Sequence, residues 1–256
     1  MDKYKSLINY FNDIGPCAVA LSGGADSAFL LHAAREALGE NLLAITAVFP
    51  YTLNRDSQAA ESVALHLGVR WKKLFLPFPR ALAMNPENRC YICKKTMMEA
   101  ITVDARAEGF ATVVDGTRFD DEEKRRPGTV ALRELGIQSP LRDCAVERAA
   151  VRRFLSLSGL DAVASRSDTC LLTRLPFGTA VDFEALRTIE AAEDLLLDLG
   201  FRDVRVRKHG PLARIEVRRE DREKLFSESV EAALLEKLRE SVYDRITVDL
   251  EGYRET

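Results

Sequence analysis

The sequence has no long hydrophobic run and no excess of basic residues. A membrane-spanning helix needs roughly 20 consecutive apolar residues, and no segment approaches that length. The opening segment, MDKYKSLINYFNDIG, also lacks the apolar core of a signal peptide, so we expect a cytoplasmic protein with no membrane partner. The formal net charge of −3 provides no general attraction for nucleic acid, and we expect no nucleic-acid partner.

Histidine and cysteine are both rare. The three histidines are not grouped as metal ligands usually are, and the five cysteines cannot all pair with one another. In a reducing compartment an odd cysteine count argues against a disulfide framework and favours metal ligation or a reactive thiol. Cys17 falls in a predicted strand and Cys144 just before a predicted helix, so we expect both to be small buried residues.

The first part of the chain alternates short apolar runs with amphipathic stretches. These predict strands at 17–21, 42–49, 69–76 and 111–116, and helices at 25–38, 55–67 and 93–108. Such alternation is typical of an α/β fold with a doubly wound parallel sheet. Ligands of these folds bind beyond the carboxyl ends of the strands, so the turns that follow the strands are the expected sites of chemistry.

The pattern changes at about residue 176. It predicts a helix at 182–199 with Asp182 as its N-cap, alternating strands at 203–210 and 212–219, a helix at 231–240 and a strand at 245–250. We therefore expect two domains, one over residues 1–175 and a small α+β domain over 176–256 that serves substrate binding or oligomerisation. We also expect a homo-oligomer.

The stretch LSGGADSA, residues 21–28, joins a predicted buried strand to a predicted helix. Glycines let the backbone approach a ligand closely, and the helix N-terminus favours an anion. The chain has no GxxxxGK[ST] motif, and this turn has no GxGxxG. The turn instead matches SGGxDS, the PP-loop with which ATP pyrophosphatases hold the pyrophosphate end of ATP. This match assigns binding of ATP, with Mg²⁺, to Ser22, Gly23, Gly24, Asp26 and Ser27.

A second motif, NRCYICK, holds Cys90 and Cys93 in a CxxC arrangement, and a third cysteine, Cys170, lies in SDTCLLTR. CxxC spacing occurs in metal sites and in redox dithiols. Three thiolates can also hold three irons of a [4Fe-4S] cluster and leave the fourth iron open, which is a variation on four-thiolate ligation. Basic residues beside the CxxC favour the thiolate form.

Five segments together give the chain a specific resemblance. They are LSGGADS (21–27), NRCYICK (88–94), DGTRFDDEEKRRPG (115–128), DTCLLTR (168–174) and VRVRKHGPLARIEV (204–217). The first motif is shared by the whole PP-loop superfamily, whereas the last two in combination are much narrower. The chain resembles the LarE family, the ATP-dependent sulfur transferases of nickel-pincer cofactor synthesis.

The resemblance implies a substrate and a reaction. The substrate is pyridinium-3,5-biscarboxylic acid mononucleotide, a carboxylate of which attacks the α-phosphate of ATP to give an acyl-adenylate and pyrophosphate. Sulfur then displaces AMP and leaves a thiocarboxylate. The sulfur comes either from a cluster on Cys90, Cys93 and Cys170, which takes up sulfide from a donor, or from Cys170 itself, which is then consumed. The presence of all three cysteines favours the cluster.

Further candidates surround the expected site. Gly116 and Thr117 follow the fourth predicted strand beside the nucleotide, and Arg126 belongs to a charged loop over it. Arg205 and Arg207 are two residues apart on a predicted strand, so they share a face, where paired guanidinium groups suit a phosphate or carboxylates. With the family pattern, the expected substrate-binding residues are Arg174, Glu193, Arg205, Arg207, Arg214 and Glu216.

Three other functions stay open at the level of sequence. A PP-loop tRNA thiolase would also use three cysteines, but RNA binding needs a broad basic face or an added module. An ammonia-using PP-loop synthetase would need a glutaminase partner and leaves the cysteines unexplained. A non-catalytic nucleotide sensor with a structural metal would bind ATP without releasing pyrophosphate.

Overall fold

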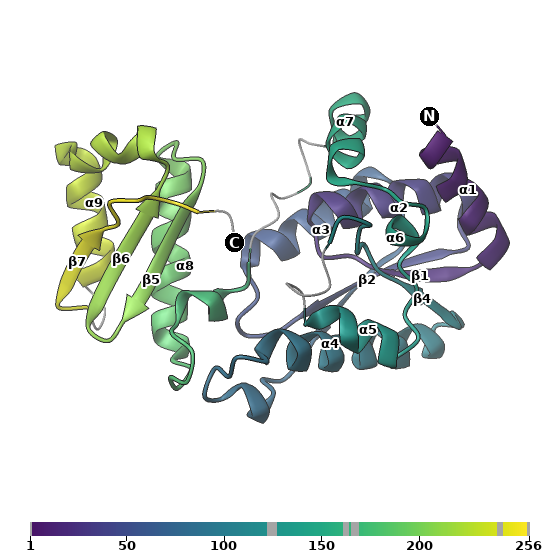
Figure 1. The fold of residues 1–256 in the computed structure, drawn as a ribbon, viewed down its shortest axis with the longest axis horizontal. Coiled ribbons are helices and arrows are strands. Elements are labelled where there is room, and N and C mark those ends of the chain that lie inside the picture. The colour runs from purple at the N-terminus through teal and green to yellow at the C-terminus, as the bar shows by residue number, and fades with distance from the viewer. Residues whose placement is uncertain (1, 122–126, 161–163, 165–168, 240–242, 255–256) are drawn as a thin grey trace. The chain divides into compact units, whose positions relative to one another are not determined.

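The computed structural model describes residues 2–121, 127–160, 164, 169–239 and 243–254. The chain folds into two compact units (Figure 1). The first consists of Met1–Leu82 and Asn88–Asp168, and the second of Ala83–Glu87 and Thr169–Thr256. The expected domain limit after residue 175 stays a prediction.

The first unit contains a parallel sheet. Its elements are α1 (Asp2–Ile14), β1 (Cys17–Ala20), α2 (Ala25–Leu38), β2 (Leu42–Val48), α3 (Asn54–His66), β3 (Trp71–Phe75), the 3-10 helix η1 (Arg80–Leu82), α4 (Arg89–Ala107), β4 (Thr112–Val114), α5 (Gly128–Glu134), α6 (Pro140–Asp143) and α7 (Arg148–Ser158). The four strands are parallel, in the order β3-β2-β1-β4. The predicted α/β fold with a parallel sheet is therefore confirmed.

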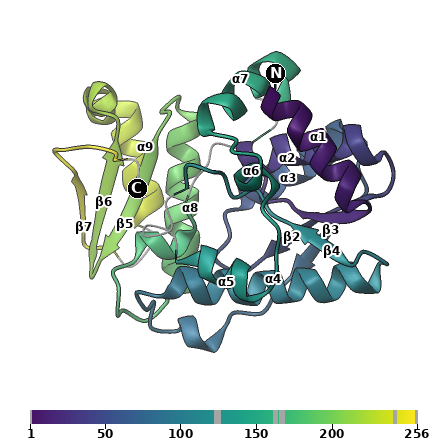
Figure 2. The ribbon, with the colours of Figure 1, turned by 45° about the vertical axis from the view of Figure 1, so that its right-hand side comes forward.

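Helices cover both faces of this sheet because its central strands are apolar on both faces. Alternate residues of β1 belong to different hydrophobic clusters: Cys17 and Val19 pack with α1, α2 and α7, whereas Ala18 packs with α4 and α5. Figures 1 and 2 show the same layers, with α4 and α5 on one side of the sheet and α1, α2 and α3 on the other. No helix among the described residues is both long and apolar enough to cross a bilayer.

One helix begins earlier than the sequence indicates. α4 begins at Arg89, with Asn88 at the N-cap position, so the predicted start at Cys93 is wrong. The Asn88 carbonyl oxygen accepts the N–H of Tyr91 at 3.0 Å, which closes a turn that contains Cys90 and precedes Cys93. Cys90 and Cys93 therefore both lie near the start of the helix, three residues apart and on neighbouring positions of its surface.

The second unit is a mixed three-stranded sheet with helices. Its elements are the 3-10 helix η4 (Leu171–Arg174), α8 (Phe183–Asp198), β5 (Val204–His209), β6 (Leu212–Val217), the 3-10 helix η5 (Arg219–Phe226), α9 (Glu228–Arg239) and β7 (Arg245–Val248). β5 and β6 form the predicted antiparallel hairpin, and β7 runs parallel to β6. Asp182 caps α8 as predicted, because its Oδ1 accepts the Ala185 N–H at 3.0 Å.

The two faces of this second sheet differ in polarity. Val204, Val206 and Ile215 are buried on the face that α8 and α9 cover (Figure 1). The intervening residues of β5 and β6 place charged side chains on the opposite face. The C-terminal segment, yellow in Figure 1, crosses that opposite face.

Candidate functional site

The SGGxDS turn follows the carboxyl end of β1 and is closed by its own hydroxyl groups. Ser27 Oγ lies 3.0 Å from Ser22 Oγ, donates to the Gly24 carbonyl oxygen at 3.0 Å and accepts the Ser22 N–H at 3.2 Å. Just before the turn, the Leu21 N–H donates to the Ile45 carbonyl oxygen of β2 at 2.9 Å. The turn is therefore fixed at the N-terminus of α2, where backbone N–H groups and the helix dipole favour an anion.

Gly23 and Gly24 have different structural roles. Gly23 has a φ of +86°, and a Cβ there would overlap the carbonyl oxygen of Asp56 in α3 and lie 2.8 Å from the Ala60 nitrogen. Gly24 has a φ of −77°, and the nearest atom to a Cβ there would be Ser22 Oγ at 3.6 Å. The fold therefore requires glycine at position 23, whereas position 24 opens onto free space.

The segment after β4 packs against the same end of α2. A Cβ on Gly116 would lie 3.1 Å from the Ser27 nitrogen, so glycine permits this close approach. Thr117 donates from its N–H and its hydroxyl to the buried Asp115 carboxylate, at 3.3 and 2.7 Å, and Ser139 donates to the same carboxylate at 2.8 Å. The structure thus brings the predicted Gly116 to the PP-loop and identifies Asp115 as the acceptor that fixes the following turn.

Arg118 is a residue of this region that sequence reasoning missed. Its buried guanidinium contacts the Asp26 carboxylate of the PP-loop and donates to Asp120 and Asp121, at 2.9 Å each. Burial raises the pKa of Asp26 above its ordinary value, and the Arg118 guanidinium opposes that shift. The available signal was the place of Arg118 in the turn after a strand. The predicted nucleotide residue Arg126 lies outside the described residues.

The CxxC cysteines belong to the same unit as the PP-loop. Cys90 is exposed and Cys93 is half-buried, and neither forms a disulfide among the described residues. The hydroxyl of Tyr51, a buried residue just after β2, donates to Cys93 Sγ at 3.2 Å. The next residue, Lys94, donates to the Asp115 carboxylate at 3.3 Å. The start of α4 is therefore bonded to the turns that follow both β2 and β4.

Cys170 belongs to the second unit, at the N-cap position of η4, and is half-buried. Arg174, at the end of η4, is fully buried and forms a two-point ion pair with Glu193 of α8, with both N–O distances at 2.9 Å. Its remaining nitrogen donates to the Cys170 carbonyl oxygen at 3.3 Å and to the Thr169 hydroxyl at 2.9 Å. Arg174 and Glu193 thus hold the Cys170 segment, and their contact with substrate stays a prediction.

The donor set fits an iron–sulfur cluster in its chemistry. Cys90, Cys93 and Cys170 are at least partly exposed and form no disulfide among the described residues, and thiolates are the usual ligands of such clusters. The first two cysteines lie in the first unit and the third in the second. Within the described parts of the chain, no three His, Cys, Asp or Glu side chains are grouped to hold a metal ion. The cluster stays a prediction.

The charged face of β5 and β6 brings four predicted residues together. Arg205 lies opposite Glu216, and Arg207 lies opposite Arg214. Glu216 Oε1 accepts from Arg207 Nε at 2.7 Å and from Arg214 Nη2 at 2.9 Å, and Arg207 also donates to the Thr173 carbonyl oxygen at 2.7 Å. The predicted shared face of the two arginines is confirmed, and their binding of substrate stays a prediction.

Arg205 is covered by an aromatic residue that sequence reasoning missed. Tyr253, in the C-terminal segment, lies with its ring centroid 4.9 Å from the Arg205 guanidinium carbon and accepts from Arg205 Nη2 at 3.1 Å. Arg205 is only 1% exposed as a result. At the end of β5, burial and the guanidinium groups of Arg214 and Arg207 lower the pKa of His209, which favours its neutral form.

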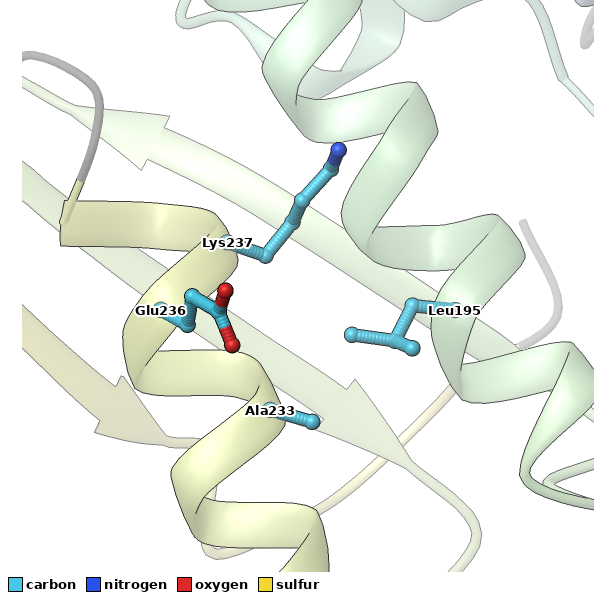
Figure 3. Close-up of a pocket in the computed structure, with 4 residues that line it drawn as sticks. All are labelled: Leu195, Ala233, Glu236 and Lys237. Carbon is cyan, nitrogen blue, oxygen red and sulfur yellow. The ribbon is translucent and has the colours of Figure 1, made fainter.

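A shallow pocket lies elsewhere in the second unit, between α8 and α9. It is lined by Leu195, Ala233, Glu236 and Lys237 (Figure 3). These helices cover the face of the sheet opposite the arginines, and none of the predicted site residues lines the pocket. The pocket therefore adds no residue to the predicted site.

Comparison with known proteins agrees with the motifs. The Asparagine synthase family model matches residues 12–103. Uncharacterised proteins of Synechocystis sp. and Methanocaldococcus jannaschii are 33% and 31% identical over 98% and 92% of this chain, and over 95% and 90% of their own lengths. The pyridinium-3,5-bisthiocarboxylic acid mononucleotide synthase of Lactiplantibacillus plantarum is 32% identical over 84% of this chain and 79% of its own length. The chain belongs to the LarE family, ATP-using enzymes of the PP-loop superfamily.

Proposed function

We propose that this protein is an ATP-dependent sulfur transferase that acts on pyridinium-3,5-biscarboxylic acid mononucleotide in nickel-pincer cofactor synthesis. Its Lactiplantibacillus plantarum relative is named for the corresponding bisthiocarboxylic acid product. The observation that carries the proposal is the SGGxDS turn at the N-terminus of α2, with the Gly116 segment packed against it. This is the place in a parallel sheet where a phosphate ligand is expected.

The PP-loop serves the first step, activation of a carboxylate. Backbone N–H groups of the turn and the hydroxyls of Ser22 and Ser27 bind the pyrophosphate end of the Mg²⁺ complex of ATP. A substrate carboxylate oxygen attacks the α-phosphorus, the bond to the bridging oxygen breaks, and pyrophosphate leaves with the electron pair. Gly116 and Thr117 are the further residues proposed to bind the nucleotide, together with Arg126, which lies outside the described residues. Activation is needed because a free carboxylate is a poor acceptor for a sulfur nucleophile.

The cysteines serve the second step, in which sulfur replaces AMP. Cys90, Cys93 and Cys170 would hold a [4Fe-4S] cluster, which when bound supplies the sulfide that becomes the thiocarboxylate sulfur. The Tyr51 hydroxyl orients Cys93, and the Arg174–Glu193 ion pair fixes the backbone that carries Cys170. The alternative is that Cys170 itself gives up its sulfur, which limits each chain to one turnover.

The arginine face serves substrate binding. Three guanidinium groups, those of Arg205, Arg207 and Arg214, share a face with the buried Glu216 carboxylate, and Arg214 also pairs with Asp249 at 3.4 Å. Such a face suits the phosphate and carboxylates of the mononucleotide. Sulfide or another sulfur donor supplies the sulfur for the second step. The expected assembly is a homo-oligomer in the cytoplasm.

Pyrophosphate release tests the proposal. Wild-type protein with Mg²⁺ and ATP should release pyrophosphate only when the mononucleotide substrate is present. A Gly24→Val variant should bind ATP weakly and release little pyrophosphate, while its melting temperature stays near that of the wild type. Pyrophosphate release that is independent of the mononucleotide, or unaffected in a folded Gly24→Val variant, would contradict the assignment.

A further inference from the structure

We infer that Arg118 is a positioning residue for ATP, which neutralises Asp26 beside the PP-loop and holds the turn after β4 against the start of α2. The inference rests on the proposed function and adds a residue outside the expected nucleotide-binding set. It is argued from three features of the first unit: the charge around the guanidinium, its place beside the turn, and the geometry of its contacts.

The first feature is a cluster of carboxylates around one guanidinium. Arg118 contacts all three carboxylates of Asp26, Asp120 and Asp121. Arg148 contributes a further positive charge near Asp26. The Arg118 and Asp121 side chains are only 4% and 2% exposed, so water screens them weakly. Without the Arg118 guanidinium, these carboxylates would lose the positive charge that they share, close to the site where a triphosphate is expected.

The second feature is the position of Asp26. It lies in the first turn of α2, whose backbone N–H groups form the expected phosphate site. An unpaired carboxylate in that turn competes with phosphate for the positive end of the helix dipole. The Arg118 contact occupies Asp26 Oδ2 and provides a positive charge beside it. Arg118 therefore lowers the repulsion that an incoming triphosphate meets.

The third feature is the fork geometry of the contacts. Each of the three guanidinium nitrogens donates to a different carboxylate, and the Arg118 backbone N–H donates to Asp121 Oδ2 at 3.0 Å. A lysine ammonium at this position keeps the charge but cannot reproduce the planar three-point contact. The side chain therefore fixes both the sign of the local charge and the position of the turn from Thr117 to Asp121.

The test is direct measurement of ATP affinity by calorimetry, with Mg²⁺ present and no mononucleotide. Arg118→Gln should raise the ATP dissociation constant about tenfold or more, because it removes the positive charge that the three carboxylates share. Arg118→Lys should give a smaller rise, and it serves as the test if the glutamine variant does not fold. Arg70→Gln removes an exposed arginine that pairs with Glu108, and it should leave the affinity unchanged.

A double variant separates charge from shape. If charge is the cause, adding Asp121→Asn to Arg118→Gln should recover part of the lost affinity, because it removes one of the negative charges. If Arg118 merely holds the turn, the second substitution removes another hydrogen-bond acceptor and lowers the affinity further, which overturns the inference. Equal affinity of wild type and Arg118→Gln also overturns it. Failure of the wild type to bind ATP would instead overturn the proposed function.

Discussion

Arg174 and Glu193 form a two-point ion pair from which water is excluded, since both side chains are completely buried. Glu193 Oε1 also accepts the N–H of Val206, on the edge strand β5, at 3.0 Å. The pair therefore links three elements: η4, which follows Cys170, the helix α8, and β5, which carries Arg205. Its geometry indicates that it supports the strand that carries Arg205.

Removing one member of this pair should destabilise the second unit. We expect Glu193→Ala to cost about 3–5 kcal/mol of unfolding free energy, because the Arg174 charge is left buried without its partner. Urea denaturation measures this cost. Glu134→Ala, which removes the exposed partner of Lys95, should change stability little. A Glu193→Ala variant with wild-type stability and a raised KM for the mononucleotide would show direct substrate binding instead.

The two glycines of the PP-loop should separate folding from nucleotide binding. Gly23→Ala should lower the unfolding free energy by at least about 1–3 kcal/mol, because it places a side chain at positive φ against the backbone of α3. Gly24→Ala should leave stability nearly unchanged, because φ is ordinary and the space is open. Thermal denaturation measures the stability of both variants, and ATP binding is measured in parallel. Equal destabilisation of the two variants would contradict this division.

Tyr253 should influence substrate binding through Arg205. Tyr253→Phe keeps the ring over the guanidinium but removes the hydrogen bond, so we expect a loss of about 0.5–1.5 kcal/mol of stability. Tyr253→Ala also removes the ring that covers Arg205. We expect it to raise the KM for the mononucleotide more than Tyr253→Phe does, while the KM for ATP stays constant. Tyr10→Phe, which removes a hydroxyl bonded to Gln138 in the other unit, provides the control. A parallel rise in the KM for ATP would argue for general damage to the fold.

The Cys17 thiol should contribute a pH dependence in the alkaline range. Burial raises its pKa from 9.0 to about 12, so the folded chain favours the neutral thiol. Its contribution to stability is therefore fully present below pH 9 and decreases as the pH rises toward 12. The stability difference between wild type and Cys17→Ala should shrink by up to about 1.4 kcal/mol per pH unit in that range. A stability difference between wild type and Cys17→Ala that stays constant from pH 8 to 11 would contradict a raised pKa of Cys17.

The strand–turn–helix units were predictable because their causes are local. The apolar run before Ser22, the two glycines and the apolar spacing after Ala25 are all local features of the sequence. The parallel sheet was predictable because such strands alternate with helices along the chain. The shared face of Arg205 and Arg207 follows from strand periodicity alone. The start of α4 was predicted too late, because the turn that the Asn88 carbonyl closes carries no strong capping signal in the sequence.

The contacts of individual charged residues were not predictable in this way. Arg118 precedes a run of charges that is typical of a solvated loop, and its burial depends on Asp26, which lies far away in the sequence. Arg174 and Glu193 were expected to face the substrate, but whether a charged residue faces a ligand or another charge depends on tertiary packing. Tyr253 carries no motif, and its role follows from where the C-terminal segment crosses the sheet.

The most direct test of the central claim is a count of products per protein chain under anaerobic conditions. Protein, ATP, Mg²⁺, the mononucleotide and sulfide are incubated together, and pyrophosphate and thiocarboxylate are measured by enzymatic assay and mass spectrometry. We expect one pyrophosphate for each thiocarboxylate, several turnovers per chain, and loss of thiocarboxylate in Cys90→Ala, Cys93→Ala and Cys170→Ala. A single turnover with consumption of Cys170 would select the sacrificial cysteine. Undiminished thiocarboxylate formation by Cys170→Ala would contradict the account.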